Sequence, residues 1–78
     1  MGSATLEDIQ KGWKVFAGAE EVGEVADVEE HAISVRRGTI LRREFRVPEE
    51  YVTEAMDGVV DLSIDRDTVE SMEVEPGR

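Results

Sequence analysis

The 78-residue sequence contains no cysteine, which excludes disulfides, cysteine-ligated zinc sites and a cysteine nucleophile. No apolar run approaches the roughly 18 residues that a membrane-spanning helix needs, and the N-terminal residues lack the basic and apolar regions of a signal peptide. Asparagine is also absent, a depletion that fits both a heat-adapted source and a GC-rich genome. We therefore expect a single cytoplasmic domain with no membrane insertion.

Positive charge is scarce. Nine Lys and Arg residues face nineteen Asp and Glu residues, which gives a formal net charge of -10 and an isoelectric point of about 4.4. A strongly acidic chain is repelled by phosphate backbones and by anionic lipid. The composition therefore disfavours DNA as a partner.

Histidine occurs once, at His31, beside Glu29 and Glu30. One histidine with flexible carboxylates in a turn makes a poor zinc site, and a serine triad would need this same histidine in a pocket. No glycine-rich phosphate-binding loop is present. The sequence thus predicts no metal, no cofactor and no enzymatic activity, and it identifies no small-molecule substrate.

What the chain does contain is a series of short apolar runs separated by turn residues. The spacing predicts five to six strands, which is typical of a small β-barrel closed by hairpins. The candidate strands are residues 13–17, 22–28, 32–37, 40–47, 52–56 and 59–64.

Glycines mark two features of these strands. Asp57-Gly58 between two alternating runs predicts a hairpin turn, because glycine accepts the positive φ that such a turn requires. Gly23 interrupts the alternation of its strand and predicts a bulge. Gly18 to Glu21 reads as the first hairpin turn, and its register stays open.

Short helical turns are predicted near both ends of the domain. Thr5 has the position of a cap for residues 5–8, and Asp67 to Glu70 has the spacing of a capping box. We expect one domain over residues 1–78, with a core from about 8 to 70 and with residues 1–4 and 73–78 flexible.

The segment DIQKGWKVFAGAEEVGEVADVEEHAISVRRG resembles the PRC-barrel superfamily. It carries Ile9, Gly12-Trp13, Val15 and the pattern Gly-x-Val-x-Asp-Val from Gly23 to Val28. The later FRVPEEYV and DGVVDLSI extend the resemblance over roughly residues 8–69. The resemblance implies an SH3-like β-barrel that docks to other proteins and does not catalyse a reaction. The first turn departs from the family, which often has Asp-Gly there.

The scarce positive charge is concentrated in one stretch, since five of the nine basic residues lie between Arg36 and Arg46. Strand alternation points Arg36, Arg42 and Arg46 outward. Arg37 and Arg43 have inward parity, so we expect them at strand ends or snorkelling to the surface.

Two interpretations of this arginine-rich stretch stay open. In one, Arg36, Arg42 and Arg46 form a docking surface, and Trp13 is an exposed aromatic anchor. In the other, the arginines neutralise Glu24, Glu29 or Glu44 across strands, and Trp13 covers an end of the barrel.

The first interpretation predicts a non-enzymatic protein–protein interaction module whose partner is another protein or a second copy of the chain. The alternative function is a module that binds a small molecule, RNA or a phosphate ligand through the Arg36–Arg46 face.

Overall fold

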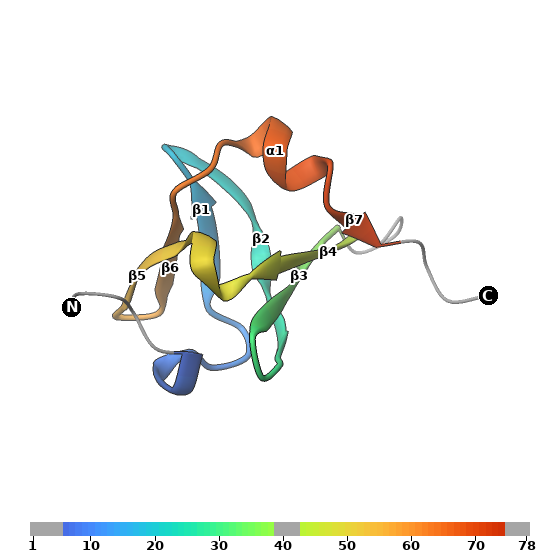
Figure 1. The fold of residues 1–78 in the computed structure, drawn as a ribbon. Coiled ribbons are helices and arrows are strands. Elements are labelled where there is room, and N and C mark those ends of the chain that lie inside the picture. The colour runs from blue at the N-terminus through green and yellow to red at the C-terminus, as the bar shows by residue number, and fades with distance from the viewer. Residues whose placement is uncertain (1–5, 39–42, 75–78) are drawn as a thin grey trace.

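The computed structural model describes residues 6–38 and 43–74 and consists mainly of one β-sheet (Figure 1). The prediction of a mainly β domain is confirmed, with seven strands in place of the expected five to six. The strands are β1 (Lys14–Ala17), β2 (Glu20–Val28), β3 (Ala32–Arg37), β4 (Arg43–Pro48), β5 (Val52–Met56), β6 (Val59–Leu62) and β7 (Glu73–Val74). The helical segments are η1 (Leu6–Asp8), η2 (Glu49–Tyr51) and α1 (Arg66–Glu70).

The strands follow the order β5-β6-β1-β2-β3-β4-β7, so that β5 and β7 are the two edges of a sheet that does not close over the described residues. Five interstrand steps of about 4.8 Å separate β4 from β5 in this order, about 24 Å in a flat sheet. Only the three residues of η2 join these two strands, and a 3₁₀ turn rises about 2 Å per residue. The sheet must therefore curl, and Figure 1 shows η2 crossing its open side in yellow.

A bulge at Gly23 lets β2 bend with the sheet. Val15 lies opposite Gly23 and Phe16 opposite Glu21, so Val22 is the extra residue. The bulge brings Val22 and Val25 to the buried side together, which explains the broken alternation in the sequence. A Cβ atom at Gly23 would lie 2.5 Å from the carbonyl oxygen of Arg36 on β3, so the close approach of β2 to β3 requires glycine.

Two tight turns close the β5–β6 and β1–β2 hairpins. The predicted Asp57-Gly58 turn is confirmed, and both residues have positive φ, at 56° and 81°. The first hairpin differs from the expectation: its loop is only residues 18–19, because Glu20 pairs with Ala17 and already belongs to β2. A tighter turn thus lengthens β2 at its start.

The helical turns near both ends of the domain are present, with one correction. Asp65, not Asp67, caps α1, and its carboxylate accepts hydrogen bonds from the backbone N–H and the hydroxyl of Thr68 at 2.9 and 2.6 Å. The helix therefore begins two residues earlier than the capping-box pattern predicted. Thr5, the expected first cap, lies outside the described residues.

The core fills the inside of the curled sheet and is closed by η1 and α1. Phe45 and Ile33 are the largest fully buried side chains, and Val35 and Val47 on the same two strands are fully buried as well. The buried cluster consists of Leu6, Ile9, Val15, Ala17, Val22, Val25, Ile33, Val35, Phe45, Val47, Val52, Val60, Leu62 and Val69.

The tail expected to be flexible, residues 73–78, begins with a short strand. Glu73 and Val74 form β7, which pairs with Glu44 and Phe45 of β4. The remaining residues of that tail, 75–78, and the expected flexible residues 1–4 lie outside the described part of the chain.

Candidate arginine docking surface

Arg36 and Arg46 project from the outward side of two neighbouring strands. Arg36 lies opposite Glu44, and Arg46 lies opposite Ser34, so the two arginines are diagonal neighbours on one face of the β3–β4 ladder. Their side chains are 40% and 63% exposed. We call these two residues, together with Arg42, the arginine face; Arg42 lies outside the described residues.

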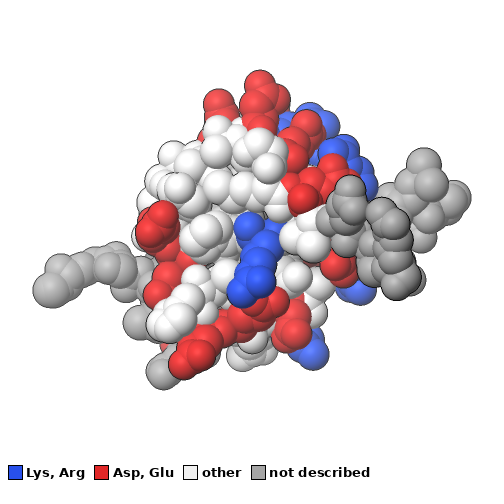
Figure 2. All heavy atoms as spheres, turned by 45° about the vertical axis from the view of Figure 1, so that its right-hand side comes forward, with Lys and Arg blue, Asp and Glu red and all other residues white. Residues whose placement is uncertain are grey.

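Each described member of the arginine face makes an ion pair. Arg36 donates to Glu24 on β2 at 3.1 Å, and Arg46 lies 2.9 Å from Glu29, which follows β2. Glu24 and Glu29 are two of the three carboxylates expected under the neutralising interpretation. On the face in view in Figure 2, the side chains of Lys and Arg lie among those of Asp and Glu.

Trp13 lies immediately before β1. Its side chain is half-buried and packs against the core cluster, and its carbonyl accepts a hydrogen bond from the N–H of Val25 at 2.8 Å. This packing is the arrangement expected for a side chain that covers one end of the core. Its exposed part remains available to a partner.

A second arginine pair, Arg37 and Arg43, lies on the inner side of the sheet where β3 ends and β4 begins. The two residues are direct cross-strand neighbours, and their guanidinium carbons lie 5.6 and 5.4 Å from the ring centroid of buried Phe45. Like charges placed directly opposite each other destabilise a sheet. This arginine pair therefore requires nearby carboxylates.

Those carboxylates come from the C-terminal elements. Arg43 donates two hydrogen bonds to Glu73 of β7, at 2.7 and 3.2 Å, and Arg37 donates one to Glu70 of α1 at 3.4 Å. Glu70 also accepts from Arg66 at 3.0 Å. These partners were not predicted from the sequence, although the inward parity of Arg37 and Arg43 signalled that both need a special environment.

The titration properties of these groups follow from the hydrogen bonds. The bonds from Arg66 and then Arg37 hold the pKa of Glu70 below its usual value, and the bonds from Arg43 do the same for the pKa of Glu73. Glu73 in turn raises the pKa of Arg43. A general acid at neutral pH needs a carboxyl pKa raised toward 7, so these carboxylates act as ion-pair partners instead.

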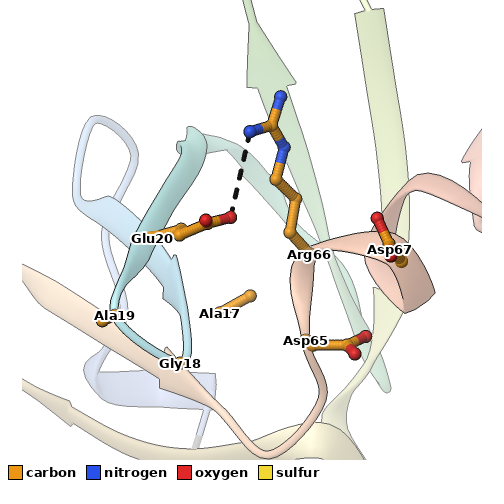
Figure 3. Close-up of a pocket in the computed structure, with 7 residues that line it drawn as sticks. All are labelled: Ala17, Gly18, Ala19, Glu20, Asp65, Arg66 and Asp67. Atoms are coloured by element: carbon orange, nitrogen blue, oxygen red, sulfur yellow. Dashed lines mark ion pairs between the residues drawn. The ribbon is translucent and has the colours of Figure 1, made fainter.

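The hollow drawn in Figure 3 lies between the β1–β2 turn and the start of α1 and has a volume of about 450 Å³. Glu20 reaches across it toward Arg66, with 3.8 Å between their charged atoms. Asp65, which also lines it, is engaged in capping α1, and the hydrogen bonds from Thr68 lower its pKa. The polar groups of this hollow thus serve the local fold.

The ring of His31 lies within hydrogen-bond distance of the Glu49 carboxylate, with Nδ1 and Oε2 3.0 Å apart. Over residues 6–38 and 43–74, no three His, Cys, Asp or Glu side chains gather closely enough to hold a metal ion. None of the helices in this same part of the chain has the length and apolarity to cross a bilayer.

Comparison of the chain with protein-family models, with curated protein sequences and with solved structures found no match.

Proposed function

We propose that the chain is a non-enzymatic, cytoplasmic protein-interaction module built as a small SH3-like β-barrel of the PRC-barrel type. The curl that η2 imposes on the sheet supports the barrel type, because the three residues of η2 hold the end of β4 close to the start of β5. The docking surface is the arginine face, together with the exposed part of Trp13. The partner is a protein surface that presents carboxylates, and a second copy of this acidic chain is one such surface.

The main support for this proposal is that the ion pairs formed by Arg36 and Arg46 are exposed to solvent. Glu24 and Glu29, the partners of Arg36 and Arg46, are themselves 46% and 37% exposed in their side chains. Solvent-exposed ion pairs contribute little to stability, so carboxylates of another protein can replace the internal partners at small cost. Arginine suits such an exchange because its planar fork binds carboxylates bidentately and is weakly hydrated.

The experiment reverses the charge of this surface. The tagged chain, wild type or with Arg36→Glu and Arg46→Glu, is incubated with a lysate of its source cells, and captured proteins are quantified by mass spectrometry. We expect the double variant to lose the proteins that the wild type captures. Single Arg46→Glu is compared with Lys11→Glu, an exposed turn residue, because both make the same change of charge.

Two outcomes would contradict this proposal. A double variant that stays β-rich by circular dichroism and captures the same proteins would mean that the arginines only neutralise Glu24 and Glu29. A gel shift of RNA by the wild type that weakens steeply with salt and is lost in the variant would favour the alternative ligand class.

A further inference from the structure

We propose that Arg37, Arg43 and the outer edge of β4 form a second binding site, which accepts an extended acidic segment of a partner protein in place of β7. We call this the β4-edge site. The inference deepens the proposed function, on which it rests, by naming the form of the partner. Its charged side chains, Arg37 and Arg43, are not those of the arginine face, which point to the opposite side of the same strands.

The chain's own β7 shows what this site recognises. The antiparallel pairing of β7 with β4 supplies main-chain hydrogen bonds. Arg43 donates two hydrogen bonds to the carboxylate of Glu73. The guanidinium groups of Arg37 and Arg43 both lie over the buried ring of Phe45. Strand addition with an anchored side chain is a general mode of peptide recognition.

The internal occupant is weakly held. β7 has only two residues, and one further backbone bond, from the N–H of Arg46 to the carbonyl of Met72 at 3.2 Å, extends its pairing. Val74 is 42% exposed and adds little apolar burial. Segments with few buried contacts and short ladders open at low free-energy cost.

The arginine pair remains in place when β7 leaves. Arg37 is only 25% exposed in its side chain and stays paired with Glu70 of α1, which Val69 anchors in the core. Arg43 then stands opposite Arg37 with its carboxylate partner removed. This unbalanced cross-strand pair favours a new carboxylate over a neutral or basic group.

The test releases β7 in the full chain and offers a replacement. Arg46 and Met72 form a hydrogen-bonded pair of the antiparallel ladder, so Val74, two residues on, occupies the next such position. Val74→Pro removes its N–H and releases the strand. The probe is a capped pentapeptide of sequence SMEVE, the chain's own residues 71–75, and binding is followed by nuclear magnetic resonance of the backbone amides.

We expect the Val74→Pro chain to bind the peptide with shifts centred on Glu44 to Arg46, and the wild type to bind it about tenfold more weakly, because a tethered strand competes at a millimolar effective concentration. Arg43→Glu in the released chain should abolish binding, and the peptide SMKVK should not bind. Arg36→Glu with Arg46→Glu in the released chain should bind as before, which separates this site from the arginine face.

Three results would overturn the assignment. The first is a Val74→Pro chain that stays folded and shows no amide shifts at millimolar concentrations of SMEVE. The second is binding of SMKVK to that chain as tightly as SMEVE. The third is a concentration-dependent dimer of the wild type that Glu73→Lys abolishes, which would assign the site to the β7 of a second copy. If Val74→Pro does not fold, Glu73→Ala, which leaves the backbone unchanged, makes the same comparison, and no gain in peptide binding there refutes the proposal.

Discussion

Replacement of Gly23 by alanine should destabilise the domain more than any other glycine-to-alanine change in a described turn or strand. Gly23 has a φ of 151°, a conformation that residues with a Cβ rarely adopt, and holding one there costs about 1–3 kcal/mol. The added Cβ would also meet the Arg36 carbonyl oxygen at 2.5 Å and Cγ1 of Val35 at 2.9 Å. Overpacking of this kind costs about 1–3 kcal/mol more.

The sum, about 2–6 kcal/mol, is large for a chain of this size, whose total stability is expected to be about 4–12 kcal/mol. At about 4–8 °C per kcal/mol, the Tm should fall by at least about 8 °C. Circular dichroism at increasing temperature measures the change, and urea unfolding gives the free energy of unfolding directly.

Gly18→Ala is the matched control. Gly18 also has a positive φ, at 67°, but no atom lies within 4 Å of the position that an added Cβ would take. Its loss of stability should therefore reflect backbone strain alone, about 1–2 kcal/mol. Equal losses of stability in the two variants would refute the reasoning. The clash of the added Cβ atom with Arg36 and Val35 on β3 would then add nothing to the cost of the Gly23→Ala change.

Two further predictions follow from the turn at Gly58 and from the C-terminal carboxylates. Gly58→Val should destabilise by more than about 1 kcal/mol, because a β-branched residue resists the positive φ of this turn; an unchanged Tm would mean that the turn tolerates any side chain. The pKa of Glu73 is lower in the folded chain, so the unfolded chain binds more protons in acid. The stability from Glu73 is therefore complete above its unfolded pKa of about 4.3 and is lost as the pH falls through the folded value. The Tm of Glu73→Gln should depend less on pH between about 5 and 3 than that of the wild type, and identical profiles would contradict the ion pair with Arg43.

Local signals in the sequence were sufficient where a residue's own conformation decides the structure. Asp57-Gly58 specifies its turn through positive φ, and the broken alternation at Gly23 marks the bulge. The bounds of β3 and β5 agree with the strands expected over residues 32–37 and 52–56. The cap of α1 was placed wrongly because Asp65 and Asp67 are both good caps, and it is Asp65 that accepts the hydrogen bonds from the N–H and hydroxyl of Thr68.

Contacts between distant parts of the chain were out of reach of the sequence pattern. Arg43 and Glu73 are 30 residues apart, and nothing local indicates that β7 returns to β4. The alternation of β3 and β4 did place Arg36 and Arg46 on one outward face. The sequence also offered Glu29 as a possible partner of these arginines, but it could not assign Glu29 to Arg46, because that pair depends on where β2 ends relative to β4.

Sedimentation velocity of the chain at low and at high salt tests the docking role of the arginine face most directly. We predict that wild-type copies associate, that salt weakens the association, and that Lys11→Glu preserves it. Arg36→Glu with Arg46→Glu should give a folded monomer under the same conditions. A double variant that stays folded and sediments as the wild type does at every concentration would contradict this docking role.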